Sequence, residues 1–378
     1  MKIKYMGTFL IAALLTGCAS SGNKVVLTVQ NPGATARKNQ MAEVSWSKVE
    51  AKLGATEGKS LKVTDGNGTQ LPWQIVTGDT GSESIIFPVS LEAGEAQTFR
   101  ITKGESAEFE PLVYGRLVPE RKDDFTWENN RTAFRVYGPA LKATGEISNG
   151  MDFWAKRTES LIIDKWYRED LSGTASYHKD HGEGLDFYKV GRTLGLGMTA
   201  PVDHDTLCLG DNFITAEVID NGPLRLSFRL TYEPYRVGER TVTETRIISL
   251  DAYSLFNKVT NIFEAETGEL TLATGIVMDM SKTSATFGDK EGIIAYETPG
   301  TETDGTIYTA AIHPAGFGDI RVLDGHYAGL NGYQPGKRYT YYAGGGWSKA
   351  GFNSFEDWTQ FVKSEKEKID QPLKIEIQ

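Results

Sequence analysis

The clearest pattern in the chain is an alternation of apolar and polar residues between positions 224 and 232. The apolar positions are Leu224, Leu226, Phe228, Leu230 and Tyr232, and the polar positions between them are Arg225, Ser227, Arg229 and Thr231. A period of two places successive side chains on opposite faces of an extended strand. We therefore predict a β-strand that buries one face and leaves the other polar.

Long segments with the character of strands follow this one. They cover 241–250, 258–264 and 270–278, and only brief turns separate them. Successive strands with short connections pair as antiparallel neighbours in a meander. Large two-sheet sandwiches are built in this way, so we expect the region 112–378 to form one large antiparallel domain.

The region before it shows shorter strands separated by turn residues. Strands are predicted at 25–29, 42–46 and 85–88, and the turn at 65–68 has the glycines and polar residues of a tight hairpin. We expect a small β-sandwich over 24–103, whose main role is to position its neighbour. The polar segment 104–111 ends in a proline and is predicted to link the two domains.

One helix is predicted near the end of the chain. Ser354 is a suitable N-cap, with Asp357 three residues later. The apolar stripe of the turns that follow consists of Phe355, Trp358, Phe361 and Val362. We place this helix from Phe355 to about Lys368.

The start of the chain has the features of a lipoprotein signal. Two lysines precede an apolar run that ends at Leu15, and the sequence LTGC ends at Cys18. The run is shorter than the about 20 apolar residues that span a bilayer. We predict a signal peptide over 1–17, lipidation of Cys18 and a flexible tether over 18–23. We expect the protein to be located in the bacterial cell envelope, where it would be an outer-membrane lipoprotein that faces the periplasm.

Composition narrows the choice of partners. The chain has a formal net charge of −10, and removal of 1–17 takes away two lysines and no acidic residue, which changes the charge to −12. Nucleic acid is therefore excluded as the expected partner. Only two cysteines are present. With Cys18 lipidated, Cys208 has no partner for a disulfide and does not build a zinc site unaided.

Several stretches resemble known families. The segment 246–263 resembles the galactose-mutarotase-like supersandwich of several carbohydrate epimerases, hydrolases and polysaccharide lyases. The mature chain as a whole resembles the family known as domain of unknown function 4861, on the stretches 120–131, 134–140, 177–191 and 341–351. Together with the strand pattern, this implies an all-β fold with a small N-terminal β-sandwich, a large antiparallel two-sheet supersandwich and one C-terminal helix. The resemblance also implies a role in the degradation of pectin and other uronate polysaccharides, and it assigns no residue a function.

Titratable side chains are concentrated between positions 164 and 191. Glycines within this segment let the backbone fold tightly, so several side chains can converge from one loop. Histidines titrate near neutral pH, and burial can raise the pKa of a carboxyl group towards neutrality. Acid–base catalysis requires groups with such pKa values. The candidate catalytic residues are Tyr177, His178, His181, Glu183, Asp186 and Tyr188. The alternative is a solvated acidic loop closed by local ion pairs.

The same loop offers two sets of metal ligands. His178 and His181 with a nearby carboxylate suit zinc, whereas Asp180, Glu183 and Asp186 suit calcium. Their spacing matches neither the zincin helix nor the EF-hand loop. We therefore expect a site without a metal or other cofactor, and a divalent cation is the alternative.

The expected substrate-binding residues are mostly cations and tryptophans. Guanidinium forks pair with carboxylates, and tryptophan faces pack on sugar rings, so this combination suits a uronic acid. The residues are Arg121, Trp127, Asn130, Arg131, Trp154, Trp166, Trp347 and Lys349. For each tryptophan the alternative is core packing, and for each arginine it is an ion pair with the acidic excess of the chain.

Three reactions are compatible with these residues. β-Elimination from a uronate needs a group that neutralises the carboxylate, for which Arg121 or Asn130 is suitable. It also needs a base for the C5 proton, such as His181, and an acid for the leaving oxygen, such as Tyr177 or Tyr188.

Hydrolysis needs two carboxyl groups beside the bond, and Glu183 with Asp186 or Asp180 would supply them. Mutarotation needs one carboxylate and one histidine. We predict a lipid-anchored carbohydrate-active enzyme for uronate-containing oligosaccharides, with elimination preferred. The alternative is a non-catalytic glycan-binding lipoprotein.

Overall fold

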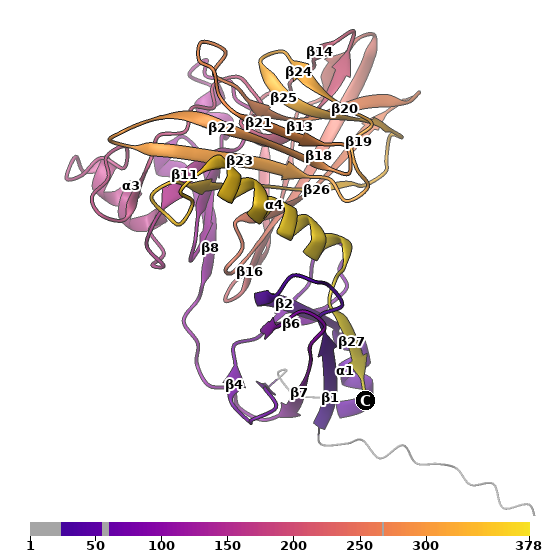
Figure 1. Cartoon of the computed structure of the whole chain (residues 1–378). Coiled ribbons are helices and arrows are strands. Elements are labelled where there is room, and N and C mark those ends of the chain that lie inside the picture. Colours follow the sequence, from indigo (N-terminus) through magenta and orange to yellow (C-terminus); the bar gives the residue numbers. More distant parts are fainter. Residues whose placement is uncertain (1–23, 55–59, 267) are drawn as a thin grey trace, which may run out of the picture.

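The computed structural model describes residues 24–54, 60–266 and 268–378. The predicted signal peptide, the lipidated Cys18 and the tether over 18–23 lie outside these residues. The described chain forms a small β-sandwich and a larger β-rich domain (Figure 1). None of its helices is long and apolar enough to cross a membrane.

The small domain consists of two antiparallel sheets packed face to face. The first has the order β27-β1-β7-β3-β4, with strands β1 (Lys24–Gln30), β3 (Leu61–Thr64), β4 (Gln70–Leu71), β7 (Ala96–Lys103) and β27 (Lys374–Ile377). The second has the order β2-β6-β5, with strands β2 (Arg37–Ser45), β5 (Gln74–Val76) and β6 (Ser84–Leu91). Apolar side chains from both sheets, among them Leu27 and Phe87, form a core of their own.

A helix that the sequence did not predict follows β2. We expected a strand over 42–46, but β2 ends at Ser45 and Trp46 begins the helix α1 (Trp46–Leu53). Trp46, Val49 and Leu53 lie on one helical face and are buried in the core of the small sandwich. Tertiary burial of this face stabilises a helix that is too short to be stable alone.

The C-terminal strand belongs to the small domain. The sequence analysis assigned all of 112–378 to the second domain, but β27 pairs with β1 in antiparallel register, with Leu27 opposite Ile377. Ile375 and Ile377 pack against the core of the small sandwich. This apolar burial and the backbone pairing hold the end of the chain on the first domain.

The largest sheet has the order β15-β16-β18-β19-β26-β23-β22-β21, and β17 also pairs with β18. Its strands are β15 (Thr215–Asn221), β16 (Arg225–Thr231), β17 (Tyr235–Val237), β18 (Arg240–Asp251), β19 (Phe256–Ala265), β21 (Thr286–Asp289), β22 (Ile293–Thr301), β23 (Gly305–Ile312) and β26 (Tyr339–Trp347). The alternation around β16 is confirmed, because the apolar positions from 224 to 232 are all buried.

A five-stranded sheet packs against this large sheet. Its order is β14-β13-β20-β25-β24, with strands β13 (Leu196–Asp203), β14 (Thr206–Leu207), β20 (Leu270–Val277), β24 (Asp319–Leu323) and β25 (His326–Tyr333). The predicted meander is therefore wrong at its third strand, since β20 pairs with β13 and β25 rather than with β19. Val259 of β19 and Leu272 of β20 lie in one shared core, so the chain crosses between the sheets to bury one face of each strand.

A second five-stranded sheet extends this core. Its order is β12-β11-β10-β9-β8, with strands β8 (Val113–Val118), β9 (Asp124–Asn129), β10 (Ala133–Val136), β11 (Asp152–Lys156) and β12 (Gly184–Asp186). Its connections contain the short helices η2 (Pro119–Arg121), α2 (Pro139–Lys142) and α3 (Ile163–Leu171). This sheet positions most of the residues expected to form the site.

The predicted C-terminal helix is confirmed as α4 (Phe355–Asp370). The Ser354 hydroxyl accepts a hydrogen bond from the backbone N–H of Asp357 at 3.1 Å, as the capping pattern predicts. Trp358 and Val362 are buried against the large sheet, and the helix then leads down to β27 (Figure 1). The predicted all-β fold, a small sandwich followed by a large antiparallel sandwich and a C-terminal helix, is confirmed.

Candidate functional site

The sheet β8–β12 has one apolar face and one charged face. Trp127, Phe134 and Phe153 point into the main core. The alternate positions form the other face, which carries Asp124, Thr126, Glu128, Arg135, Asp152, Trp154, Lys156 and Asp186. Aromatic side chains of α3 and of the loop 172–183 pack on this second face. The charged groups are therefore buried beneath the segment that the sequence analysis singled out.

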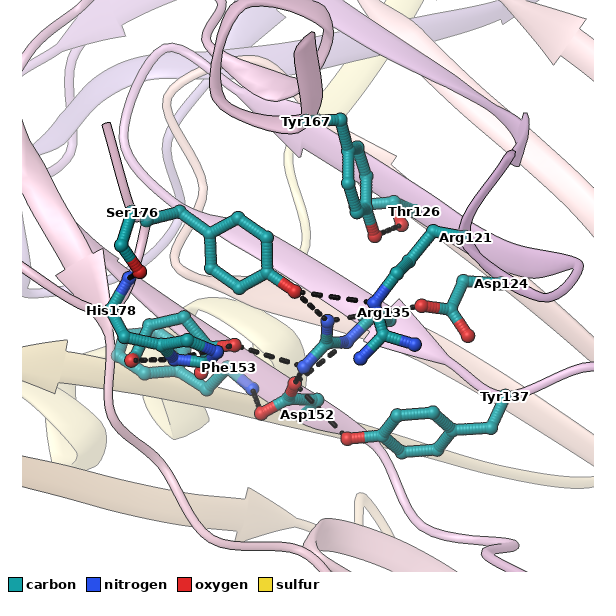
Figure 2. A network of polar contacts seen from close by, with 12 residues as sticks. Arg121, Asp124, Thr126, Arg135, Tyr137, Asp152, Phe153, Tyr167, Ser176 and His178 are labelled. Atoms are coloured by element: carbon teal, nitrogen blue, oxygen red, sulfur yellow. Dashed lines mark hydrogen bonds and ion pairs between the residues drawn. The ribbon is translucent and has the colours of Figure 1, made fainter. Parts of the chain in front are cut away.

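Arg135 lies at the centre of the charged face (Figure 2). Its Nε and Nη2 donate hydrogen bonds to Asp152 Oδ2 at 2.9 and 2.6 Å, and Nη2 also donates to Asp186 Oδ2 at 2.9 Å. Asp124 Oδ2 lies 3.8 Å from Nη1. All four residues are buried, so one guanidinium is shared by three carboxyl groups.

Tyr177 connects Arg135 to a second arginine. Its hydroxyl oxygen accepts hydrogen bonds from Arg135 Nη1 at 3.3 Å and from Arg121 Nε at 3.4 Å. The Tyr137 hydroxyl donates to Asp152 Oδ2 at 3.1 Å, and the Tyr137 ring lies 5.2 Å from the Arg135 guanidinium. Aromatic faces and carboxylates thus surround the buried cation together.

His178 leads from this network to the surface. Its Nδ1 lies 2.9 Å from the backbone carbonyl oxygen of Asp186 and 3.7 Å from Asp186 Oδ2, and its side chain is 57% exposed. The His178 ring lies beside Tyr177, with the ring centroids 4.5 Å apart. Tyr177 and Asp186 therefore meet at Arg135, and His178 contacts both of them from the solvent side.

Burial changes the protonation of the carboxyl groups around Arg135. It raises the pKa of Asp124 to about 7, although Arg135 and Arg121 oppose the rise. Burial, together with repulsion from Asp152, raises the pKa of Asp186 well above its usual range. Both oxygens of Asp124 lack a hydrogen-bond partner among the described residues. At neutral pH the cluster therefore holds at least part of a proton on its carboxyl groups.

A second buried ion pair lies further along the same face. Lys156 Nζ donates to Glu128 Oε2 and to the backbone carbonyl of Asn129, both at 2.7 Å. Glu128 Oε1 accepts the backbone N–H groups of Ile162 and Ile163 at 2.7 and 2.8 Å, at the start of α3. Glu128 thus neutralises Lys156 and satisfies the orphan donors of the helix that covers the charged face.

A cavity of about 260 Å³ opens beside the end of β11. The cavity is lined by four cationic side chains and one carboxylate, which are Arg131, Lys156, Arg157, Lys349 and Glu159. Trp347 forms part of its wall, and the charged groups of Arg157 and Lys349 lie 5.7 and 5.8 Å from the Trp347 ring centroid. Arg131 has no side-chain hydrogen bond or ion pair within the described chain.

Arg157 connects this cavity to the predicted catalytic loop. Its Nη2 pairs with Asp180 Oδ2 at 2.7 Å, and its Nε donates to the carbonyl oxygen of Gly182 at 3.2 Å. These two residues flank His181, which is exposed and has its Nε2 3.2 Å from the Ser176 carbonyl oxygen. One arginine of the cavity wall therefore contacts the residues on both sides of His181, through the Asp180 side chain and the Gly182 backbone.

A larger groove of about 970 Å³ continues from the cavity. Both are lined by Asn130, Arg131, Glu159 and Leu255, so they form one continuous depression. The groove runs between the small sandwich, the outer face of the large sheet and α4, which contribute Asp79, Lys258 and Glu365 respectively. The depression is thus longer than a pocket for one small ring.

Comparison with known proteins gives the family. The profile of a family described as a domain of unknown function, DUF4861, matches residues 29–375. This chain belongs to the DUF4861 family. It is also 30% identical over 403 aligned residues to "Uncharacterized protein P7" of Formosa agariphila, and the alignment covers 100% of both chains. The resemblance that the sequence analysis described is confirmed.

Two solved structures resemble the DUF4861 chain at low identity. One is an α-mannosidase from Enterococcus faecalis, with a TM-score of 0.48 and 9% identity, and the other is a protein in glycosyl hydrolase family 38 from the same species, with a TM-score of 0.47 and 10% identity. Each alignment covers 95% of this chain and 47% or 48% of the other. The DUF4861 chain thus spans about half the length of either.

Three of the predicted catalytic residues do not join the others. Glu183 is held by Lys165 Nζ at 2.9 Å and by Trp166 Nε1 at 3.2 Å. Tyr188 is buried in the main core, and His181 lies on the exposed part of the loop. The predicted convergence of several loop side chains therefore holds for Tyr177, His178 and Asp186, and the other three residues lie apart from them.

The predicted tryptophan platform is also wrong for most of its members. Trp127 is fully buried, and its Nε1 donates to Asn257 at 2.7 Å. Trp154 of β11 and Trp166 of α3 stack on each other where the helix packs on the sheet, with centroids 5.6 Å apart and exposures of 0% and 6%. Trp347 lines the cavity, but it is only 1% exposed. Core packing explains these side chains better than contact with a sugar face.

The polar substrate-binding residues divide between two places. Arg121 joins the network around Arg135, whereas Arg131, Asn130 and Lys349 line the cavity. Asn130 also accepts the backbone N–H of Tyr253 at 2.8 Å, which fixes its amide. The structure thus brings three of the predicted binding residues together around one opening.

In the described part of the DUF4861 chain, no three histidine, cysteine or acidic side chains form a metal-binding group. The loop residues proposed as ligands have other partners. Asp180 Oδ1 accepts the backbone N–H groups of Gly182 and Gly184, and Asp186 binds Arg135. The Asp180 carboxylate therefore closes the loop, and the Asp186 carboxyl group binds the guanidinium of Arg135.

The sequence analysis missed several residues of the site. Asp124 and Asp152 flank Arg135, and Arg157 and Glu159 line the cavity. A signal for Asp124 was present, since Asp124, Thr126 and Glu128 alternate with aromatic residues along β9. Such alternation places the acidic residues on one face and the aromatic residues in the core.

Proposed function

We propose that this protein is an envelope lipoprotein that acts on uronate-containing oligosaccharides by acid–base catalysis, with β-elimination preferred over hydrolysis or mutarotation. The observation that carries the proposal is the charge of the cavity beside β11. Four cations and one carboxylate line it, although the whole chain has a net charge of −10. Such a local reversal of charge selects an anionic ligand.

The arrangement of the cations suits a sugar carboxylate. Lys156 is neutralised by Glu128, and Arg157 pairs with Asp180. Arg131 has no partner in the described residues, and Lys349 donates to the backbone carbonyl oxygen of Thr303. Arg131 and Lys349 thus keep most of their charge available, and guanidinium binds a carboxylate in bidentate fashion.

Elimination from a bound uronate requires a definite set of bond and proton changes. A base removes the C5 proton, the electron pair forms the C4–C5 double bond, the C4–O bond breaks, and an acid protonates the leaving oxygen. We propose that Arg131 neutralises the sugar carboxylate and that His181 removes the C5 proton. His181 supports this role because it is exposed and Arg157 holds both of its neighbours.

The network around Arg135 contains the other candidate groups. Tyr177 lies between two arginines, and His178 gives it access to solvent. Arg157, which pairs with Asp180 of the same loop, lines the cavity. We propose that Tyr177 and His178 support the loop that carries His181. Tyr177 is the candidate acid that protonates the leaving oxygen.

A non-catalytic glycan-binding lipoprotein is the second candidate. The observation that favours it is the fixed state of Glu183 and Asp186, whose carboxylates are occupied by Lys165 and Arg135. In that case the same cations bind the sugar acid and no proton is transferred. The two candidates differ in whether the oligosaccharide changes.

Mass spectrometry of oligosaccharides incubated with soluble protein tests the proposal. The protein should begin just after Cys18, and the substrates should be pectin-, ulvan- and glucuronan-type oligosaccharides, with and without chelator. Elimination gives fragments whose masses sum to that of the parent, and hydrolysis gives fragments with one added water.

Two histidine variants separate catalysis from binding. His181→Ala should abolish turnover and leave binding intact, whereas His204→Ala should change neither, since His204 is 96% exposed and lines neither cavity. Unchanged oligosaccharides that still bind would favour the binding lipoprotein. An absence of both binding and turnover for every substrate would overturn the proposal.

A further inference from the structure

The floor of the larger groove is a row of polar side chains in register. Ser227, Ser249, Lys258 and Tyr342 are successive Cα partners on β16, β18, β19 and β26, and all four line the groove. The strands lie about 4.8 Å apart, so the row extends about 14 Å across the sheet. This length and its hydroxyl and amino groups suit a polar chain better than a single small molecule.

The opposite face of these strands explains why the row points outward. Phe228, Ile248 and Val259 alternate with the row and are fully buried in the main core. A period of two therefore places Ser227, Ser249 and Lys258 on the groove side. Ser227 is buried and its hydroxyl donates to Asp220 Oδ2 at 2.5 Å. Ser249 is half-buried and Lys258 is exposed, so these two positions are accessible from the groove.

Lys258 is the member of the row that carries charge. It is exposed, and its ammonium group has no hydrogen bond or ion pair with any described residue. Three of the other cations of the groove are paired, and Arg131 at its junction with the cavity is not paired within the described chain. Arg225 binds Asp251 at 2.5 Å and Glu43 at 2.8 Å, Arg338 pairs with Asp79, and Lys368 binds Glu365 at 2.7 Å.

The small sandwich supplies the facing wall of the groove. Lys38 and Met41 of β2 and the segment 78–84 line it. Its position over the sheet is fixed by Gln74, whose Oε1 accepts the backbone N–H groups of Leu224 and Arg225 at 2.8 and 2.7 Å. The groove is thus a built feature between two docked domains.

We propose that this groove is a second subsite, which binds a further acidic sugar unit of the same oligosaccharide through Lys258, with Tyr342 and Ser249 beside it. The inference rests on the proposed function, because it extends the same ligand from the cavity. Arg131 lines both openings and marks the point where they join. The substrate is then an acidic chain of several units rather than a monosaccharide, and the small sandwich is part of its binding site.

Calorimetric titration of the full-length chain in detergent with oligogalacturonates of one to six units tests the inference. The variant is Lys258→Ala. Its control is Lys282→Ala, which removes the same charge from an exposed position that lines neither opening. A matched set of methyl-esterified oligosaccharides removes the acidic charge of the ligand.

The expected result is an affinity that rises with length, by roughly tenfold or more from the shortest to the longest ligand. Lys258→Ala should abolish this rise and leave the affinity for the shortest acidic ligand unchanged, and Lys282→Ala should behave as wild type. The affinity for methyl-esterified ligands should show no rise with length that depends on Lys258.

Two other outcomes overturn the inference in different ways. If the acidic ligands bind and the affinity of Lys258→Ala rises with ligand length as much as that of wild type, the proposal of a second subsite is wrong and the proposed function stands. If no acidic oligosaccharide binds to the wild-type chain, the subsite and the proposed function are both wrong.

Discussion

Arg135 and Asp152 are Cα partners on β10 and β11, and two nitrogens of the guanidinium donate to one oxygen of the carboxylate. The pair is buried, together with Asp124 and Asp186. Removing one member of such a cluster leaves charge without a partner in a medium that solvates it poorly. The stability of the folded chain is therefore sensitive to single charge changes in the network around Arg135.

Replacement of Arg135 by methionine tests this sensitivity. The change leaves three buried carboxyl groups without their shared cation, so we expect a loss of about 3–5 kcal/mol in the free energy of unfolding. Urea denaturation followed by fluorescence measures it. Arg229→Met is the control, since Arg229 forms an exposed pair with Glu217 that contributes at most about 1 kcal/mol. Equal losses in the two variants would contradict the prediction.

Asp124 predicts a dependence of stability on pH. Burial raises its pKa to about 7 in the folded chain, against about 3.9 in an unfolded chain. The folded state therefore binds the proton more tightly, and the contribution of Asp124 to stability is full below pH 4 and is lost as the pH rises to 7. Asp124→Asn removes this dependence.

The measurement is the free energy of unfolding of wild type and Asp124→Asn at pH 4 to 8. The stability of the variant relative to wild type should increase with pH, by at most about 4 kcal/mol in total. For Asp170→Asn, on the outer part of α3, the free energy of unfolding should depend on pH in the same way as for wild type. A constant difference between Asp124→Asn and wild type across this range would show that the Asp124 pKa is not raised.

The buried pair of Glu128 and Lys156 predicts coupling between two substitutions. Glu128→Gln leaves the Lys156 ammonium buried without its carboxylate, whereas the amide oxygen can still accept the N–H groups at the start of α3. Lys156→Met then removes the unpaired charge. We expect the double variant to be more stable than Glu128→Gln alone, by about 1–3 kcal/mol, as a double-mutant cycle in urea would measure. Strictly additive losses would contradict this.

Arg131 predicts a change in substrate binding without a loss of stability. Its side chain has no partner among the described residues, so Arg131→Ala leaves no carboxylate unpaired. If the cavity binds a uronate, the variant should raise KM by roughly tenfold, which corresponds to about 1.4 kcal/mol, with a smaller change in kcat. Steady-state kinetics on the active oligosaccharide measure both, and Arg168→Ala on α3 is the charge-matched control. An unchanged KM would remove Arg131 from the binding site.

Local patterns in the sequence predicted much of the fold. The alternation around β16 and the capped stripe of α4 appeared where the pattern placed them, because side-chain period and capping act within a few residues. The partner of β20 and the position of β27 depend on contacts between residues far apart in the chain. A single sequence does not contain that information in a local pattern.

The site was predicted in part for the same reason. The loop 164–191 was recognised by its density of titratable groups, but groups that bind its members come from elsewhere in the chain, such as Arg135 of β10. Trp127 was taken as a binding residue from its neighbours in sequence, whereas the alternation along β9 directs it to the core. The pattern of charged and aromatic residues on β9 was the stronger guide.

The pairing of β27 with β1 also affects how the protein can be made. The ribosome produces β1 early and β27 after every other described strand, so β1 keeps an unpaired edge during almost all of the synthesis of the chain. Unpaired edges are sites where strands of different molecules associate. A fragment that ends at residue 103 would keep this edge permanently, and we expect it to aggregate unless residues 374–377 are fused to it or supplied as a peptide.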